Sequence, residues 1–459
     1  MVLQGTMQVL HVVHGFPPEF QGGTECYVRR LAEAQRDRGL RVSVLTGTEE
    51  VTAAHAAVVA VDEKGLPVHA LRRFGLCGDR WDQAASPEAE ARIAALLRRT
   101  RPDVLHLHHW IRLCRSVARL GAAAGIPVVW TLHDLSSTCP RLSRVLDDGT
   151  LCRQPLAVAH CLGCAPSDPW QHREELAEAI EEYAADLAAE QQAACLRIAP
   201  SAAQRDFLAP LHGLGPERYV VLPHGMLHRL RCCGPRPADP AGRLRLVHWG
   251  FWYRDKGVHV LLEALRRLHG PERERVHLTL YGQAVFPAYA REIEQLAAGL
   301  PVTLAGAFDP SALPGERFDL AVLPTLAHES HSFVLDEAFA LGLPVLASRI
   351  GALPERVGAA GALFPPGDAA ALAACLEEAI RDPRRLEAWR ARLPAAPLDM
   401  DEHAGALEPL YRAAIAAGPP ADAPRPPRRD SARRLRERLV ASRELEIHRL
   451  HWHLEFGSG

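Results

Sequence analysis

The sequence predicts an α/β protein built from two domains in series, followed by a C-terminal helical extension. Two observations support this prediction. Short apolar runs typical of buried strands alternate with segments of helical length, and the alternation occurs twice, before and after a proline-rich stretch at 235–240. The chain is also 459 residues long and 48% hydrophobic, which exceeds what one hydrophobic core usually organises. We therefore expect two parallel sheets with crossover helices that face each other across a cleft.

The first half of the chain carries the first alternation. Strand-like apolar runs occur at 9–13, 41–45, 104–107 and 128–132. A long alanine- and glutamate-rich segment, about 171–195, is expected to form a helix before two further strands, in IAPS and VVLPHG. We predict that residues 1–234 form an N-terminal domain, with a cysteine-rich insertion at 136–166.

The alternation begins again at Leu244, in the sequence LRLVHWG. A helix with apolar residues at helical spacing follows, and then four strands, in VHLTLYG, PVTLAGAF, FDLAVLP and LPVLAS. We predict a second domain at 243–400 and a helix at 401–417 that packs back on the first domain. A proline-rich linker at 418–429 and an amphipathic helix at 430–456 complete the chain. For this last helix, a packing or homo-oligomerisation role is favoured over a membrane-surface role.

The composition argues against nucleic acid as the main partner. Lys and Arg total 53 against 55 for Asp and Glu, so the formal net charge is -2, whereas a nucleic-acid-binding protein is usually basic. The first residues, MVLQGTMQVLHVVHG, have no basic leader and predict a first strand rather than a signal peptide. Isolated cysteines such as Cys195 and Cys375 fit a reducing compartment. We expect a cytoplasmic protein, with peripheral contact at the inner face of the membrane left open for the C-terminal helix.

The segment HESHSFVLDEA carries the strongest candidate site. It places Glu329 before a helix that is predicted to start near Ser332 and Phe333, and Glu337 along that helix. The Ser332 hydroxyl is expected to cap the helix, whose first N–H groups and positive dipole end suit a diphosphate. Two such carboxylates can accept hydrogen bonds from sugar and ribose hydroxyls of one extended ligand. The competing interpretations are a glycosidase acid and nucleophile pair, which must converge on one bond, and a solvated helix start.

Two turns are further candidates for phosphate or sugar contact. In HWGFWYRDKG a strand ends and Arg254 and Lys256 follow, and such cations can neutralise a leaving diphosphate. In HGFPPEFQGGTE, Gly22 and Gly23 lie between a strand and a helix, where a backbone without a Cβ can approach a ligand closely. Each motif alone is also an ordinary turn, so its weight comes from occurring together with the two glutamates.

Histidines gather at the predicted carboxyl ends of two strands. His106, His108 and His109 close one strand, and His133 is followed by Asp134 at the end of another. Because the carboxyl ends of parallel strands meet at one edge of a sheet, we expect a cluster of imidazoles there. One or two of them are equally well explained as core or rim histidines.

These motifs, in this order, resemble the retaining glycosyltransferases of family 4, which have the GT-B fold of two Rossmann-like domains facing across a cleft. The matching pieces are GGTE, RPDVLHLHH, TLHD, IAPS, VLPHG, the Lys-Gly turn, the segment from Glu329 to Glu337, GLPVLASRIGALPE and LFPPGD. The resemblance extends from Met7 to about Ala417. No piece is specific alone, and their joint order carries the resemblance.

The resemblance implies a hexosyltransferase with a UDP- or GDP-sugar on the second domain and a sugar, lipid-linked or small-molecule acceptor on the first. It implies that Arg254 and Lys256 contact the diphosphate. Glu337 would contact the ribose, and Glu329 with the backbone amides after it would contact the sugar. His133 would lie near the reactive face of that sugar. A leaving phosphate oxygen would take the proton of the acceptor hydroxyl, so the anomeric configuration is kept without a catalytic metal.

The chain departs from the family pattern at two positions. Similar proteins usually carry Arg directly after the strand-ending glycine, where this chain has Phe251. Either Arg254 serves from a shifted position or phosphate binding is weaker. Similar proteins also usually carry Asn where this chain has His224, in a turn that mainly shapes the domain junction.

Four cysteines lie in the insertion that follows TLHD. Cys139, Cys152, Cys161 and Cys164 occupy an irregular segment, and CLGC supplies the close pair typical of a metal site. Four thiolates in one loop suit a closed tetrahedral zinc site, which would order a loop too polar to fold on its own packing. Four free thiols or a disulfide pair are the alternatives. Because His133 is a few residues upstream, an ordered loop here is expected to shape the acceptor pocket.

Two other functions stay open at this stage. A nucleotide-sugar epimerase or hydrolase on the same scaffold would act on the donor without an acceptor. A catalytically weak homologue would serve as a binding subunit, an interpretation supported by Phe251 and the long C-terminal helix. The base, the hexose and the acceptor depend on a few loop side chains, so the sequence leaves them open.

Overall fold

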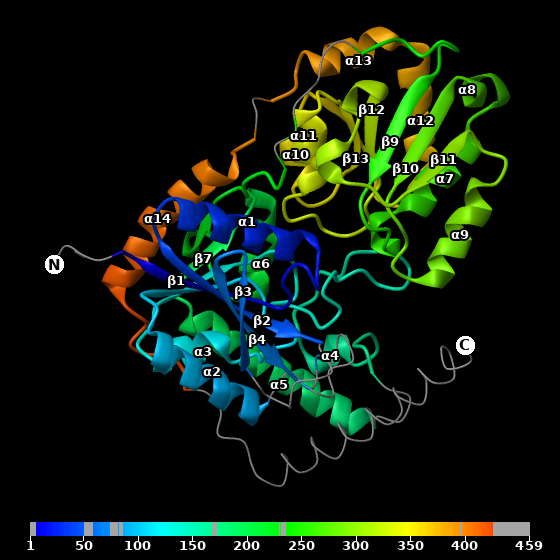
Figure 1. Cartoon of the computed structure of the whole chain (residues 1–459). Helices are drawn as coiled ribbons and strands as arrows, with labels where there is room; N and C mark the ends of the chain where they lie inside the picture. Colours follow the sequence, from blue (N-terminus) through cyan, green and yellow to red (C-terminus); the bar gives the residue numbers. More distant parts are fainter. Residues whose placement is uncertain are drawn as a thin grey trace, which may run out of the picture.

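The computed structural model describes residues 6–49, 58–73, 81, 86–167, 172–228, 230, 236–394 and 397–425. Within these residues the chain forms two α/β halves, one after the other, each built on its own sheet (Figure 1). The predicted helix at 430–456 and part of the predicted linker at 418–429 lie outside the described residues. No helix in the described part of the chain is both long and apolar enough to cross a membrane.

The N-terminal half is built on an eight-stranded sheet. Its strands are β1 (Gln8–Val13), β2 (Arg41–Thr48), β3 (Val58–Glu63), β4 (Leu66–Arg72), β5 (Val104–Leu107), β6 (Val128–Thr131), β7 (Leu196–Ala199) and β8 (Tyr219–Val221). Their order is β3-β4-β2-β1-β5-β6-β7-β8, and neighbouring strands are parallel except for β3 with β4. The central strands are buried on both faces, which explains why they are continuous apolar runs in the sequence.

The C-terminal half is built on a six-stranded parallel sheet. Its strands are β9 (Leu244–Trp249), β10 (Val276–Tyr281), β11 (Val302–Gly306), β12 (Leu320–Leu323), β13 (Val345–Ser348) and β14 (Gly361–Phe364). Their order is β11-β10-β9-β12-β13-β14. The order reverses direction at β9, and in open sheets of this kind the crevice for a ligand opens at such a point, outside the carboxyl ends of the strands.

Helices connect the strands in both halves. The first half contains α1 (Gly23–Asp37), α2 (Pro87–Thr100), α3 (Val117–Ala123), α4 (Val158–Cys161), α5 (Arg173–Ala193) and α6 (Ala202–Leu211). The second contains α7 (Val258–Arg267), α8 (Gly270–Glu274), α9 (Pro287–Ala297), α10 (Phe333–Ala340), α11 (Leu353–Val357), α12 (Ala369–Arg381) and α13 (Pro383–Arg390), and α14 (Met400–Ala417) follows. The prediction of two parallel-sheet α/β domains is confirmed.

The N-terminal sheet is covered by helices on both faces. Alternate residues of β1 point to opposite faces, so Leu10 and Val12 belong to one apolar core and Val9 and Val13 to another. The first core includes residues of α2, α3 and α5, and the second includes residues of α1 and α14. The last described helix of the chain therefore completes a core of the first half.

Helix α14 returns from the C-terminal half and lies beside α1 (Figure 1). The contact is partly polar. Tyr27 and His403 share a hydrogen bond of 2.6 Å between the phenol oxygen and Nε2, and Gln35 Nε2 donates to the Tyr411 hydroxyl at 3.0 Å. At the surface, the Arg38 guanidinium contacts carboxylates of α14. These bonds hold the end of the described chain against its first helix.

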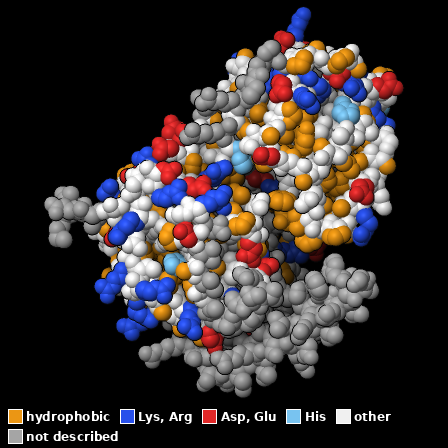
Figure 2. Space-filling model, in the orientation of Figure 1, with side chains coloured by type: hydrophobic (Ala, Val, Ile, Leu, Met, Phe, Trp, Pro, Cys, Tyr) orange, Lys and Arg blue, Asp and Glu red, His pale blue; other side chains and the backbone are white. Residues whose placement is uncertain are grey.

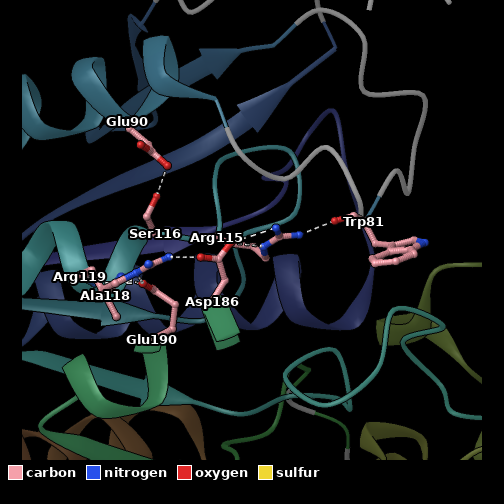
Figure 3. A network of polar contacts seen from close by, with 8 residues as sticks. All are labelled: Trp81, Glu90, Arg115, Ser116, Ala118, Arg119, Asp186 and Glu190. Atoms are coloured by element: carbon pink, nitrogen blue, oxygen red, sulfur yellow. Dashed lines mark hydrogen bonds and ion pairs between the residues drawn. The ribbon is translucent and has the colours of Figure 1, made fainter. Parts of the chain in front are cut away.

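A buried ionic network joins α3 to α5 (Figure 3). The Glu190 carboxylate accepts hydrogen bonds from the backbone N–H groups of Ala118 at 2.6 Å and Arg119 at 3.3 Å. It also pairs with the Arg119 guanidinium at 2.6 Å, and Asp186 pairs with Arg119 and Arg115. Glu190 thus satisfies free N–H groups at the start of α3 from a neighbouring helix. Burial raises the pKa of Glu190 to about 7.

We expect Glu190→Ala to lower the free energy of unfolding by about 3 kcal/mol, because it removes one of the two carboxylates that pair with the buried Arg119 and leaves the first N–H groups of α3 without their acceptor. Urea unfolding followed by circular dichroism measures the change. Glu181→Ala, at an exposed position of the same helix, is the matched control and should change stability by less than about 0.5 kcal/mol. Equal losses for the two variants would contradict the role of the network.

Candidate active site

The predicted site residues of the second half follow the carboxyl ends of two adjacent strands. The Lys256 ammonium, in the 3-10 turn Arg254–Lys256 after β9, donates to Glu329 Oε1 at 2.6 Å. Glu329 lies in the loop after β12. The structure therefore joins directly two residues that are 73 positions apart in the sequence. A cation and a carboxylate in contact can exchange this contact for a ligand that carries both phosphate and hydroxyl groups.

The Lys-Gly turn is fixed against the loop after β12. Gly257 has a φ of 69°, and a Cβ there would lie 1.9 Å from the carbonyl oxygen of Pro324. The backbone carbonyl of Asp255 accepts from the N–H of Leu326 at 2.7 Å and from the Thr325 hydroxyl at 3.1 Å. Glycine is required at this position both for its left-handed backbone and for the close approach of the two loops.

The same loop contacts the N-terminal half. The Ser330 hydroxyl donates to the backbone oxygen of His133 at 2.5 Å. Gly23 also lies close to the C-terminal half. A Cβ atom built on Gly23 would be 3.4 Å from the ring of Phe333. Nearby, the carboxylate of Glu355 accepts from two backbone N–H groups in the first turn of α6. The predicted glycine turn, His133 and the Glu329 loop are therefore brought together.

Helix α10 begins at Phe333 as predicted, but the predicted role of Ser332 as its cap is wrong. Ser332 has φ 72° and ψ 91°, and its side chain makes no capping hydrogen bond. In that left-handed region the side chain is turned away from the first helical N–H groups, which a cap residue in extended conformation would reach. A non-glycine residue held there stores about 1–3 kcal/mol of strain, which is typical of ligand-binding segments. The first turn of α10 is left without a side-chain cap.

Glu337 is buried on α10 and has an unforeseen partner. The indole N–H of Trp249, the last residue of β9, donates to Glu337 Oε2 at 2.6 Å. Its other oxygen, Oε1, is 3.9 Å from Nε2 of His228. Burial raises the pKa of Glu337 to about 7, although the Trp249 hydrogen bond acts in the opposite direction. The sequence signal for Trp249 is its place directly before the strand-ending Gly250.

Arg254 takes a different direction from Lys256. Its guanidinium contacts Glu292 of α9 at 2.6 Å and lies above the Tyr289 ring. Both cations nevertheless line one cavity of about 600 Å³, together with Tyr253, Asp255, Phe286, Ala288, Tyr289, Glu292 and Ala327. Two residues of this lining, Tyr253 and Phe286, are exposed aromatic side chains, and Figure 2 shows hydrophobic side chains on the surface of the C-terminal half. Arg254 is thus paired with Glu292 of α9, whereas Lys256 is paired with Glu329.

In the N-terminal half, His133 lies after β6 and is buried. Its ring stacks on His224 with centroids 4.8 Å apart and meets the edge of Tyr27 at 5.0 Å. Burial lowers the pKa of His133 to about 3, so its imidazole is neutral near pH 7. The expected cluster of imidazoles is present, because His108 shares a hydrogen bond of 2.9 Å with His133.

Two residues near the glycine turn, His14 and Glu25, were not predicted as site residues. His14 Nε2 contacts Glu25 Oε1 at 3.0 Å, and the His14 ring lies 4.5 Å from that of His109. His109 in turn contacts Asp134 at 3.3 Å. His14 directly follows β1, and Glu25 belongs to the GGTE motif. Both could have been found as polar residues at a strand end and at the start of the following helix.

The four predicted zinc ligands share one loop but do not have zinc geometry in this structure. Sulphur atoms in a tetrahedral site lie about 3.8 Å apart, for Zn–S bonds of about 2.3 Å. Among the described residues, a set of three ligand atoms within 4.8 Å of one another is formed by His11, His106 and His108, and not by the cysteines. Cys139, Cys152, Cys161 and Cys164 are free thiols here. Zinc binding stays a prediction.

A buried arginine orders this cysteine loop. The Arg144 guanidinium donates to the backbone oxygens of Thr138 at 2.7 Å, Cys152 at 2.9 Å and Gln154. Burial raises the pKa of Cys139 to about 11, so this thiol stays protonated at neutral pH in the absence of a metal. A zinc ion was predicted to order this loop, whereas in this structure the Arg144 guanidinium and three backbone carbonyls supply part of that order.

Comparison with known proteins agrees with this geometry. Residues 21–226 match the model described as Glycosyltransferase Family 4, and residues 243–382 match the model described as Glycosyl transferases group 1. A glycogen synthase of Mycobacterium tuberculosis is 30% identical over 437 residues, which cover 89% of this chain and 95% of that protein. A D-inositol 3-phosphate glycosyltransferase of Catenulispora acidiphila is 28% identical, covering 69% of this chain and 73% of the relative.

Solved structures share the fold. Anabaena Alr3699/HepE, in complex with UDP, superposes with a TM-score of 0.61 at 20% identity, covering 89% of this chain and all of that one. A sucrose-phosphate synthase from Thermosynechococcus elongatus superposes with a TM-score of 0.60 at 21% identity, covering 90% of this chain and all of the other. Both likenesses extend through the two halves described above.

We expect Glu337→Gln to stabilise the ligand-free protein, increasingly as the pH rises from 5 to 8. The carboxyl is protonated in the folded chain up to a pKa of about 7 and ionised above about 4.5 in the unfolded chain, so wild-type stability falls between these values. Glutamine never ionises and its side-chain oxygen can still accept from Trp249. The gain at pH 8 should reach about 1–3 kcal/mol.

Urea unfolding at pH 5 and pH 8 measures this difference. The control is Glu294→Gln, at an exposed position of α9, whose stability relative to wild type should not depend on pH. A constant offset for Glu337→Gln at both pH values would show that its carboxyl is not held neutral in the folded protein.

Proposed function

The chain belongs to the family 4 glycosyltransferases of GT-B fold, and from this we propose that it is a retaining enzyme that moves a hexose-type sugar from a UDP- or GDP-sugar to an acceptor hydroxyl. Residues 243–400 would bind the donor and residues 1–234 the acceptor. The solved neighbour Anabaena Alr3699/HepE forms complexes with UDP and with UDP-glucose, which supports a nucleotide-sugar donor.

One observation carries the proposal. The loop after β12 contacts Lys256 through Glu329 and the backbone of His133 through Ser330, at 2.6 and 2.5 Å. A donor bound along this loop would have its phosphates beside the cation and its sugar between the two halves of the molecule. That arrangement suits transfer to an acceptor held by the other half.

The hydrogen bonds and ion pairs of the ligand-free site indicate which residues would contact each part of the nucleotide sugar. Lys256 and the uncapped first turn of α10, from Ser332 and Phe333 onward, would hold the diphosphate. Glu337 would receive the ribose hydroxyls through Oε1, since Trp249 occupies Oε2. Glu329 would exchange its contact with Lys256 for sugar hydroxyls. Arg254 would assist if it left Glu292 for the phosphates, which is how this chain could compensate for Phe251.

The reaction breaks the bond between the anomeric carbon and the leaving phosphate oxygen. Lys256 and the α10 amides would stabilise the negative charge that develops on this phosphate. The phosphate oxygen would take the proton of the acceptor hydroxyl, and the acceptor oxygen would bond to the anomeric carbon on the face that the phosphate leaves, which retains the anomeric configuration. His133, neutral and buried, would contact the sugar rather than carry this proton. No step of the proposal is assigned to a metal.

For the acceptor, we propose a chemical class and not a single compound. Relatives are named for glycogen, D-inositol 3-phosphate and phosphatidyl-myo-inositol. These compounds are a polysaccharide, a phosphorylated cyclic polyol and a lipid. The His14–Glu25 and His109–Asp134 pairs, with the turn at Gly22 and Gly23, would supply polar groups for hydroxyls of any of them. We therefore propose a hydroxyl-rich acceptor and name no single compound.

We expect Lys256→Ala to lower kcat about 100-fold, because it removes a charge that stabilises the departing diphosphate. The assay uses the nucleotide sugar that gives the largest thermal shift in a panel of UDP- and GDP-sugars. Lys64 is the other lysine of the chain and lies exposed in the β3–β4 turn, so Lys64→Ala is a matched control. Wild-type turnover in Lys256→Ala would show that the Lys-Gly turn is only structural.

The sequence contains only two lysines, Lys64 and Lys256, which allows a direct binding test. An amine-selective reagent should label Lys256 and Lys64 in the free protein, and a nucleoside diphosphate should protect Lys256 alone. Equal labelling of Lys256 with and without the nucleotide would contradict its placement on the diphosphate.

We expect Glu329→Ala to reduce transfer strongly while leaving affinity for the bare nucleoside diphosphate nearly unchanged, since that ligand lacks the sugar that Glu329 would contact. The substitution releases Lys256, whose side chain is already 43% exposed, so the fold should tolerate it. Calorimetric titration measures the affinity and product formation measures the transfer. Glu294→Ala is the control at an exposed glutamate of the same half.

The product identifies the reaction. NMR of the glycosidic linkage should show the anomeric configuration of the donor, and an inverted centre would contradict the retaining assignment. Release of free sugar without an acceptor, with rescue of Glu329→Ala by azide, would instead support a hydrolase with a carboxylate nucleophile. Absence of nucleotide binding in the wild type would support a binding subunit.

A further inference from the structure

A string of buried histidines runs inward from His133. His133 Nε2 shares a hydrogen bond of 2.9 Å with His108 Nδ1, and His108 Nε2 shares one of 2.9 Å with His11 Nδ1. His11 Nε2 then contacts Gln35 Oε1 of α1 at 2.8 Å. The string therefore connects the candidate active site, through two imidazoles, to one amide in the core beside α14.

The string is a hydrogen-bonded relay rather than a metal site. His11, His106 and His108 bring ligand atoms within 4.8 Å of one another. All six of their ring nitrogens, however, already have hydrogen-bond partners, because His106 contacts the Tyr411 hydroxyl and Thr131 Oγ1, each at 2.7 Å. A metal would have to displace several of these bonds inside a fully buried core.

In a string of neutral imidazoles, all the hydrogen bonds must be donated in the same direction. A neutral ring has one nitrogen that donates and one that accepts, so the role of one nitrogen determines the role of the other. Because the Gln35 carbonyl oxygen accepts, His11 Nε2 carries its proton and His11 Nδ1 accepts. His108 then donates from Nε2 and accepts at Nδ1, and His133 must donate from Nε2. Burial lowers the pKa of each of these three rings, which keeps them neutral.

A second arm holds the Gln35 amide in this orientation. Its Nε2 donates to the Tyr411 hydroxyl at 3.0 Å, so that hydroxyl can donate to His106 Nδ1. His106 then donates from Nε2 to Thr131. The two arms share one amide, so neither can reverse unless the amide flips and the other arm reverses with it. Tyr411 belongs to α14, so these hydrogen bonds include the last described helix of the chain.

We propose that Gln35, His11 and His108 are positioning residues that hold His133 as the Nε2–H tautomer, so that its Nδ1 accepts a hydrogen bond from a hydroxyl of the bound sugar. His133 Nδ1 makes no hydrogen bond to any residue that the structure describes. The identity of the hydroxyl rests on the proposed function, whereas the tautomer does not. Nδ1 of His133 is then always a hydrogen-bond acceptor. It distinguishes a sugar with a hydroxyl opposite Nδ1 from an analogue that lacks this hydroxyl.

The wild-type protein provides the first test. Long-range proton–nitrogen NMR correlations of protein labelled with nitrogen-15 histidine distinguish a protonated ring nitrogen from a bare one, and His133→Asn identifies the His133 signals. The expected spectrum has a protonated Nε2 and a bare Nδ1 in ligand-free protein near pH 7. A protonated Nδ1 with a bare Nε2, or a doubly protonated ring, would overturn the proposal. This measurement requires no turnover, so it separates the proposal from the proposed function.

The second test breaks the string at its far end. Gln35→Met keeps the side-chain length but removes the carbonyl that orients His11, so the His133 signals should shift toward a mixture of tautomers. With the active nucleotide sugar, kcat should fall about tenfold while affinity for the bare nucleoside diphosphate is unchanged. Gln191→Met is the control, because Gln191 is also buried and contacts a histidine, His212, outside the string. Unchanged His133 signals in Gln35→Met, or equal changes in both variants, would overturn the proposal.

Discussion

The loops that follow the carboxyl ends of the strands in two separate sheets form one site only if contacts hold the loops together. Here the loop after β12 makes these contacts. Glu329 reaches Lys256 in one direction and Ser330 reaches the backbone of His133 in the other. The turn at Gly257 permits the first contact, because any side chain there would collide with the backbone of Pro324. Two side-chain contacts of one loop therefore bring Lys256 and the backbone of His133 to the same place, and the backbone at Gly257 permits the close approach that the first contact requires.

Burial then determines what the polar groups of the site can do. Removal from water disfavours charge, and it moves the pKa of Glu337 up to about 7 and that of His133 down to about 3. Such groups serve as hydrogen-bond partners more readily than as charges. The proposed transfer needs this division, because Lys256, with its side chain partly exposed, supplies the charge while His133 and Glu337 supply directional contacts.

The N-terminal core contains several buried imidazoles. Each buried polar atom needs a partner, and His11, His106 and His108 find theirs in one another, in Gln35 and in residues of β6 and α14. Through Tyr411, α14 therefore supplies a polar partner as well as apolar side chains to the core of the first half. Tyr411 of α14 contacts Gln35, so a continuous path of hydrogen bonds links this helix to His133.

Periodicity and strand-end motifs were enough to predict the two sheets and to select Lys256, Glu329, Glu337 and His133, because these signals are local in the chain. The pairings were not predictable: Trp249 with Glu337, Arg254 with Glu292, and the uncapped, left-handed Ser332 depend on residues far apart or on backbone angles. The spacing of the four cysteine sulphurs is likewise a property of the folded loop. Sequence order specifies which groups lie at a sheet edge, and only tertiary packing decides which of them touch, because contact requires both backbones to approach within a few ångströms.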